Sequence, residues 1–250
     1  MSPLRFEGRS VLVTGAASGI GRATAIRLAE EGASLVLADL DRSGLEQTAS
    51  DCAGPGSVHV QPTDVADEAA VVTLVERSVE ELGGLDVLCN VAGILAFEDF
   101  RRTTLESFER IVAVNLTGTF LVCREALPHL LERGGNIVNV ASTAALAGHP
   151  WTAPYSASKG GVLAMSLTLA VEFGKLGLRC NVVAPGSIET PIQGAFRLPE
   201  GADAKLLHRI MALDRMRGPE TVAGAIAFLA SEDAAHVNGE VLKVDGGTLA

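Results

Sequence analysis

The sequence is poor in aromatic residues and in positive charge, and both shortages narrow the possible functions. Phe, Trp and Tyr together make up 4% of the 250 residues, with one Trp and one Tyr, whereas hydrophobic residues make up 48%. This balance is typical of an α/β interior built from Val, Ala and Leu. The formal net charge is -10 and no block of Lys or Arg is present, which argues against a nucleic-acid partner.

Long apolar runs are also absent. No stretch approaches the roughly 18 uninterrupted apolar residues of a membrane span, and residues 1–8 have no apolar core of the signal-peptide type. We therefore expect a soluble, cytoplasmic protein with no membrane partner. Linker-like stretches rich in Gly, Pro and Ser are missing too, so the chain is expected to form one domain over residues 1–250.

Cysteine is scarce and scattered. The four cysteines lie far apart and mostly within apolar runs, and the five histidines show no ligand spacing. Buried free thiols are therefore expected rather than disulfides, and no metal site is predicted.

A glycine-rich turn follows the first apolar run of the chain. Residues 9–14 are apolar in character, Gly15, Gly19 and Gly21 follow, and residues 22–30 continue with helical periodicity. A second apolar run, residues 34–38, follows this helix. Strand, glycine turn, helix and strand in this order indicate a nucleotide site, because a helix amino terminus with close backbone approach can hold a pyrophosphate. The spacing differs from the common Gly-x-Gly-x-x-Gly pattern.

An acidic residue, Asp39, ends the second strand. A carboxylate there would accept hydrogen bonds from the adenosine ribose and repel a 2′-phosphate, which favours NAD over NADP. Two alternatives stay open: Asp39 caps the turn formed by residues 39–41, or Arg42 turns toward a phosphate.

Apolar runs and helical patterns alternate along the rest of the chain, which predicts a Rossmann-like, doubly wound parallel sheet of about seven strands with helices on both faces. The further strands are expected at 58–60, 85–89, 136–140, 178–183 and 241–244, and the further helices at 68–82, 105–131, 153–175 and 221–229. Residues 187–215 are rich in Pro and Gly, with one weak helix near 204–211, and are predicted to form a substrate loop or lid.

Tyr155 and Lys159 stand four residues apart at the start of a predicted helix, so both side chains are expected on one helix face. A tyrosine has an ordinary pKa of about 10, and a nearby positive charge favours the phenolate. The pair is therefore a candidate for proton transfer to or from a substrate oxygen.

With the glycine turn and the Tyr155/Lys159 pair both present, the chain resembles the short-chain dehydrogenase/reductase family of the compact, single-domain kind. Further motifs extend the resemblance over almost the whole chain: Asp64 and Val65 resemble an adenine-contacting pair, and residues 90–93 resemble an Asn-Asn-Ala-Gly motif in which Cys89 replaces the first Asn. Residues 185–190 resemble the segment that contacts the nicotinamide carboxamide, and residues 244–247 resemble the family's closing turn.

The resemblance implies roles for particular residues. Tyr155 would be the general acid or base, Ser142 would hold the substrate oxygen, Lys159 would lower the Tyr155 pKa and contact the nicotinamide ribose, and Asn115 would support a water that links Lys159 to solvent. The implied cofactor-binding set is Gly15, Ser18, Gly19, Ile20, Gly21, Asp39, Asp64, Val65, Asn90, Ala92, Gly93, Tyr155, Lys159, Pro185, Gly186, Ile188 and Thr190.

The function implied is hydride transfer between NAD(H) and a secondary alcohol or ketone. Activities like those of 3-oxoacyl reductases, hydroxysteroid dehydrogenases and polyol dehydrogenases are not separated by the sequence. Two other functions stay open: a non-catalytic NAD-binding redox sensor, and an epimerase or dehydratase with tightly held NAD.

Substrate specificity is expected from the loops that follow the strands, at residues 94–96, 144–151 and 187–211. His149 and Trp151 are candidates for substrate contact. No Arg or Lys is placed by a motif to bind a carboxylate or phosphate, which favours a neutral, fairly hydrophobic substrate. The helix at 153–175 is rich in small residues, and relatives use this helix in a subunit interface, so a homotetramer or homodimer is expected.

Overall fold

Seven parallel strands form one sheet in the order β3-β2-β1-β4-β5-β6-β7. The computed structural model describes residues 4–213 and 215–250; residues 1–3 of the predicted domain and position 214 of the predicted lid lie outside this part. The strands are β1 (Ser10–Thr14), β2 (Ser34–Asp39), β3 (Val58–Pro62), β4 (Val87–Asn90), β5 (Asn136–Val140), β6 (Arg179–Pro185) and β7 (Val241–Val244). The predicted Rossmann-like, single-domain fold is confirmed.

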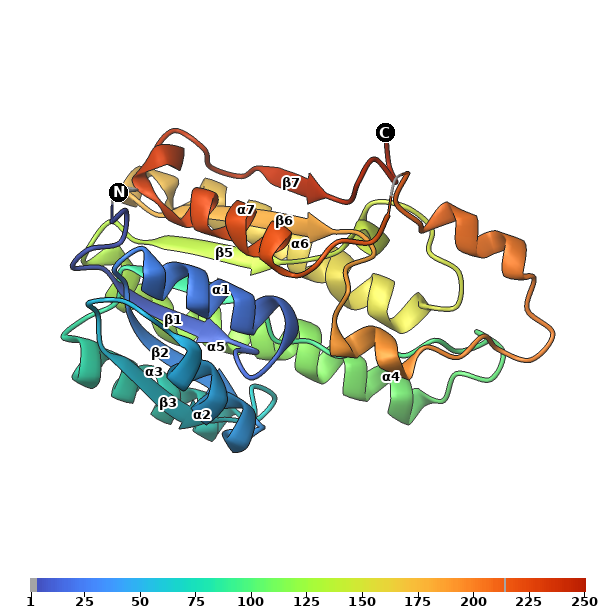
Figure 1. Ribbon diagram of the computed structural model, residues 1–250, viewed down its shortest axis with the longest axis horizontal. Helices are drawn as coiled ribbons and strands as arrows, with labels where there is room; N and C mark the ends of the chain where they lie inside the picture. The colour runs from blue at the N-terminus through green and yellow to red at the C-terminus, as the bar shows by residue number, and fades with distance from the viewer. Residues whose placement is uncertain (1–3, 214) are drawn as a thin grey trace.

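Helices cover both faces of the sheet (Figure 1). On one face lie α1 (Gly19–Glu30), α2 (Arg42–Asp51) and α7 (Glu220–Ala230). On the other lie α3 (Glu68–Leu82), α5 (Gly118–Leu131), which α4 (Leu105–Val112) precedes, and α6 (Ala153–Phe173). Alternate side chains of a strand point to opposite faces, so Val11 and Val13 join one buried cluster and Leu12 joins the other.

Two features of the helices differ from the sequence prediction. The single helix predicted at 105–131 contains a π-helical turn, η1 (Ala113–Thr117), between α4 and α5. Helix α2 was not predicted, because its sequence is mostly polar and Leu45 is its one large, fully buried apolar residue.

The segment Leu105–Leu131 is long and apolar enough to cross a membrane by length and composition alone. In this fold one face of the segment packs in the core, since Leu121, Val122, Ala126 and Leu130 are buried in the cluster between the helices and the sheet. Its apolar character therefore follows from its place in the core.

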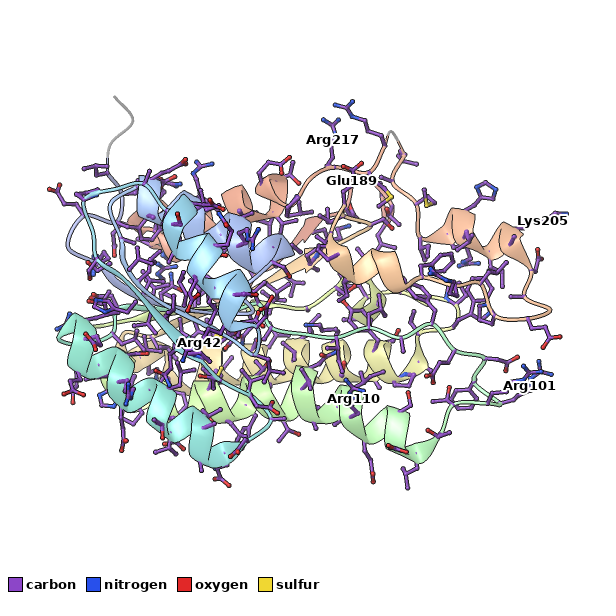
Figure 2. The ribbon with its side chains drawn as sticks, turned by 60° about the horizontal axis from the view of Figure 1, so that its bottom comes forward. Arg42, Arg101, Arg110, Glu189, Lys205 and Arg217 are labelled. Atoms are coloured by element: carbon purple, nitrogen blue, oxygen red, sulfur yellow. The ribbon has the colours of Figure 1, made fainter. Side chains whose placement is uncertain are left out.

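All strands end at the same side of the sheet, where the segment after β6 projects beyond the rest of the chain (Figure 1). This segment contains two 3-10 helices, η4 (Pro191–Ala195) and η5 (Ala204–Arg209), so the weak helix predicted near 204–211 is present in the 3-10 form. Its base is joined by a bridge between Ile188 and Arg217, and the Glu189 N–H donates to the Arg217 carbonyl at 2.9 Å. Figure 2 shows Glu189 and Arg217 next to each other.

Candidate active site

The glycine turn between β1 and α1 requires glycine at two positions. Gly15 has a φ of 69°, and a Cβ there would lie 2.7 Å from the backbone nitrogen of Ala92. A Cβ on Gly21 would overlap the carbonyl oxygen of Gly15. The turn thus packs its backbone directly against the end of β4 and against helix α1.

Helix α1 presents its amino terminus next to this turn. Its N-cap residue, Ser18, makes no side-chain capping bond, and no acidic residue stands in the first helical turn. The N–H groups and partial positive charge of this terminus can therefore serve an anion, which fits the phosphates of a dinucleotide.

A cavity of about 420 Å³ adjoins the turn and the helix terminus. Most residues of the predicted cofactor-binding set line it: Gly15, Ser18, Gly19, Ile20, Gly21, Asp39, Asp64, Val65, Ala92, Gly93 and Thr190. Arg110 of α4, labelled in Figure 2, also borders this cavity.

Asp39 lines the cavity and also caps the turn that follows β2. One carboxylate oxygen accepts from the Ala17 N–H at 3.2 Å and the other accepts from the Asp41 N–H at 3.1 Å. The capping interpretation is therefore correct, and it leaves Asp39 within the cavity wall. Arg42, which is exposed, lies 3.6 Å from Glu46 on the same helix.

A second cavity, of about 250 Å³, holds three of the four predicted catalytic residues: Ser142, Tyr155 and Lys159. Pro185, Gly186, Ile188 and Thr190 line it as well. Ile20, Gly93 and Thr190 border both cavities, so the two spaces adjoin and an elongated ligand can extend from one into the other.

Ser142 follows β5 and begins a short 3-10 helix. Its Oγ accepts a hydrogen bond from the Ala144 N–H at 3.1 Å. Because a hydroxyl has one proton to donate, this arrangement leaves the Ser142 proton available to a ligand oxygen or to Tyr155.

Lys159 is almost fully buried beside Tyr155. Its Nζ donates to the Val140 carbonyl at 2.8 Å and lies 5.9 Å from the centroid of the Tyr155 ring. Burial lowers the pKa of Lys159 from its ordinary value to about 8.

The pKa of Tyr155 differs from the sequence expectation in direction. Burial raises this pKa above its ordinary value, and a hydrogen bond with Ser142 acts in the opposite direction. The net shift is therefore upward for the protein alone, because desolvation of the phenolate outweighs the effect of the Ser142 hydrogen bond. A lowering contribution from the Lys159 charge stays a prediction.

Asn115 lies in the π-helical turn η1, buried beneath the cavity rather than in its wall. Its side chain donates to the Ile94 carbonyl at 2.9 Å and to Ser158 Oγ at 3.1 Å, and accepts from the Ile94 N–H at 2.8 Å. A Cβ on Gly93 would lie 3.2 Å from Asn115 Oδ1 and 3.3 Å from Lys159 Nζ, so both side chains border Gly93.

Asn90 is not brought to either cavity. Its amide donates to Asn139 Oδ1 at 2.9 Å and to Cys123 Sγ at 3.2 Å, within a buried polar cluster under the sheet. Cys89, which precedes it, is fully buried in the opposite face. Trp151 also lines neither cavity, although His149 borders the second one.

Comparison with known proteins gives the family. The family model described as Enoyl-(Acyl carrier protein) reductase matches residues 15–248. The 3-oxoacyl-[acyl-carrier-protein] reductase FabG of Thermotoga maritima is 40% identical over 246 residues, which cover 98% of this chain and 99% of that protein. The chain belongs to the short-chain dehydrogenase/reductase family.

Two further members of this family illustrate its range. Meso-2,3-butanediol dehydrogenase of Serratia marcescens is 37% identical over 247 residues, which cover 99% of this chain and 97% of that protein. The crystal structure of 3-ketoacyl-(acyl-carrier-protein) reductase from Brucella melitensis complexed with NADH has a TM-score of 0.90 and 35% identity, covering 98% of this chain and 99% of that one. These relatives are oxidoreductases and do not favour the sensor or epimerase alternatives.

The second cavity also contains residues that the sequence patterns did not identify. Phe97, on the loop after β4, meets Phe196 of the projecting segment edge to face, with ring centroids 4.6 Å apart. Both rings line the second cavity, and an exposed ion pair of 3.3 Å joins Arg102 to Glu200 across the same two segments. Phe196 lies within the specificity loop predicted at 187–211, and Phe97 directly follows the one predicted at 94–96, but their contact was not predicted.

Proposed function

We propose that this protein transfers a hydride between NAD(H) and a secondary alcohol or ketone, with Tyr155 as general acid and base. The observation that carries the proposal is the second cavity, shared by Ser142, Tyr155 and Lys159, which adjoins the cavity at the glycine turn. The close backbone approach at Gly15 and the uncapped terminus of α1 fit a dinucleotide pyrophosphate.

The bound nicotinamide would supply or accept the hydride. During ketone reduction Tyr155 would donate its proton to the substrate oxygen, and during alcohol oxidation it would accept that proton. Ser142 would donate a hydrogen bond to the same oxygen, since its Oγ already accepts from Ala144. A raised Tyr155 pKa suits the donor role, because the phenol is then protonated at neutral pH.

Lys159 and Asn115 would act behind the reacting group. The Val140 carbonyl holds the Lys159 Nζ 5.9 Å from the centroid of the Tyr155 ring, and Lys159 would contact the nicotinamide ribose. Asn115 and Lys159 both border Gly93, which supports a role for Asn115 in a proton relay through water to Lys159.

NAD is the proposed cofactor rather than NADP. The Asp39 carboxylate borders the adenosine side of the cavity, where it would repel a 2′-phosphate and accept from ribose hydroxyls. Arg42 is close to Glu46, which reduces its tendency to serve a phosphate.

The proposed substrate is neutral and largely apolar near its reacting carbon. The described lining of the second cavity contains no carboxylate, and its basic side chains are Lys159 and His149. A charged substrate group in this space would lose its hydration without gaining a matched partner. Residues 187–215 would form the lid over the site.

We further propose a cytoplasmic homotetramer or homodimer formed through α6 and the helical segment Leu105–Leu131, which contains Asn115. Gly161 packs within the chain, since a Cβ there would lie 2.7 Å from Leu116, whereas Gly160 and the strongly exposed Val171 face outward. Light scattering tests this proposal, and a particle of 25.9 kDa would contradict it.

The proposed function is tested by following NADH absorbance with a panel of ketones and secondary alcohols that spans acyl thioesters, steroids and sugars. Turnover of at least one neutral ketone, faster with NADH than with NADPH, is the expected result. A panel that yields only NADH binding, without oxidation, would favour a non-catalytic role.

A further inference from the structure

His149 borders the cavity of Tyr155 with a ring nitrogen that has no partner. Its Nε2 is shielded from solvent and forms no hydrogen bond within residues 4–213 and 215–250. Buried polar atoms in folded proteins are nearly always paired, because leaving one unpaired costs stability. Asn90, Glu98 and Asn136 also have an unpaired buried oxygen, but of these four residues His149 alone lines the cavity of Tyr155, which points to a partner supplied by a ligand.

The backbone of His149 is fixed relative to Tyr155. Thr152, which precedes helix α6, donates its hydroxyl to the His149 carbonyl at 3.2 Å. The Thr152 carbonyl in turn accepts from the Ser156 N–H at 2.7 Å, within the first turn of the helix that carries Tyr155. The backbone of His149 is thus anchored to the helix that positions the reacting group.

The segment between His149 and α6 is held in an unusual conformation. Trp151 has a φ of 62°, which non-glycine residues rarely adopt. Its carbonyl accepts from the Glu98 N–H at 2.8 Å, so the loop after β4 stabilises this conformation. Such strain persists where the surrounding structure enforces it, often beside functional sites.

Among the described polar side chains of the cavity wall outside the catalytic residues, His149 is the one that makes no side-chain hydrogen bond. Thr152, Ser187 and Thr190 also line the cavity, but each of their hydroxyls lies within hydrogen-bonding distance of a backbone carbonyl as donor. The neighbouring wall is apolar and includes Leu95, Phe97, Phe196, Leu207, Ile210 and Met211.

The His149 imidazole is suited to a neutral oxygen. Burial lowers its pKa, so the ring is neutral near pH 7. A neutral imidazole donates from one nitrogen and accepts at the other, and it can therefore pair with either a carbonyl or a hydroxyl.

We propose that His149 determines specificity by hydrogen-bonding a second oxygen of the substrate, a carbonyl or hydroxyl one or two carbons from the reacting carbonyl. This inference rests on the proposed function, in which Tyr155 and Ser142 take the reacting oxygen. A simple ketone leaves His149 unpaired, whereas a dicarbonyl or hydroxyketone satisfies it. Sites built to pair a substrate oxygen discriminate strongly against analogues that lack it.

The test compares ketones that differ in the second oxygen. One pair is butane-2,3-dione and butan-2-one, and the other is ethyl 3-oxobutanoate and heptan-2-one. The variants are His149→Phe, which keeps a planar ring without hydrogen-bonding nitrogens, and His149→Asn, which keeps a donor and an acceptor. The kcat/KM ratio within each pair cancels changes in overall folding and cofactor binding.

In His149→Phe the ratio is expected to fall by about tenfold or more for at least one pair, while kcat/KM for the simple ketone changes by less than about threefold. His149→Asn is expected to restore part of the ratio. Ratios that stay within about twofold in both pairs, or an equal loss for both members of each pair, would overturn the proposal.

A binding measurement separates this inference from the proposed function. Tyr155→Phe saturated with NADH is titrated with all four ketones by NMR, with and without the His149→Phe change. Tighter binding of the bifunctional ketones that is lost in His149→Phe supports the inference, whether or not the wild type turns these ketones over. Absence of turnover in the wild type would contradict the proposed function alone. Equal affinities for both members of each pair would overturn the inference.

Discussion

The Lys159 ammonium donates a hydrogen bond to the Val140 carbonyl at 2.8 Å, which joins helix α6 to the end of strand β5. Lys159 is 3% exposed, so this single bond accompanies the burial of a group that prefers water. The lowered pKa, about 8, records the energetic cost of charging the amine in this position. The hydrogen bond between Lys159 and Val140 thus fixes helix α6, while burial of the charged amine lowers the free energy of unfolding near neutral pH.

Replacing Lys159 is expected to change the pH dependence of folding. Between pH 7 and about pH 9.5 the folded protein binds fewer protons at Lys159 than the unfolded chain does, so the free energy of unfolding gains a contribution that rises with pH. From pH 7 to about pH 9.5 the free energy of unfolding of the wild type should therefore rise by about 2 kcal/mol more than that of Lys159→Met.

Urea unfolding at both pH values measures this difference. Lys175→Met, which removes an exposed lysine, is the control and should follow the wild type. Parallel pH profiles for the wild type and Lys159→Met would show that burial of the amine does not carry the predicted cost.

Alanine at Gly15 is expected to destabilise the fold more than alanine at Gly8. Both glycines have a φ near 70°, at 69° and 71°, so both changes incur backbone strain of about 1–2 kcal/mol. Only at Gly15 would the new Cβ also meet the Ala92 backbone, at 2.7 Å, since nothing lies within 4 Å at Gly8. Denaturant midpoints measure the difference; equal losses would mean that the turn relaxes away from β4.

Removing the Asp39 charge is expected to reduce the preference for NADH. In Asp39→Ser the ratio of kcat/KM for NADH to that for NADPH should fall by about tenfold or more, because the repulsion of a 2′-phosphate is lost. Asp51→Asn removes a charge from the end of α2 and should leave the ratio unchanged. A wild-type preference for NADPH would itself refute the role given to Asp39.

Phe97→Ala is expected to weaken the binding of apolar ketones. The change removes the edge-to-face contact with Phe196 and part of the cavity wall, so kcat/KM should fall by about tenfold, mostly through KM. Phe100→Ala on the same loop is the control, because that ring is 77% exposed. An equal effect of the two changes would mean that Phe97 acts through the loop rather than through the cavity.

Much of this fold could be predicted from sequence because each buried strand is a short apolar run and each turn has a distinct residue pattern. The turn at Gly15 is an example, since its glycines mark the same positions where a Cβ would collide with backbone. Helix α2 could not be predicted because it buries little apolar surface. The π-helical turn at Asn115 could not be predicted because the composition and periodicity of the surrounding helix continue through it.

The site was predictable to the extent that its residues belong to local motifs. Tyr155 and Lys159 share a helix, so their spacing in sequence indicates their proximity. The contact between Phe97 and Phe196 joins segments a hundred residues apart, and no local pattern reports it. The upward shift of the Tyr155 pKa could not be predicted for a related reason. The spacing in sequence indicates that Lys159 is near, but it does not indicate that the phenol is buried.

The central claim is that Tyr155 exchanges a proton with the substrate oxygen, and Tyr155→Phe tests it most directly. The measurement is kcat for reduction of a ketone substrate, together with the NADH dissociation constant from fluorescence. We expect kcat to fall at least about a hundredfold in Tyr155→Phe, with NADH affinity within about threefold of the wild type. A variant that binds NADH normally and keeps a substantial fraction of the wild-type kcat would contradict it.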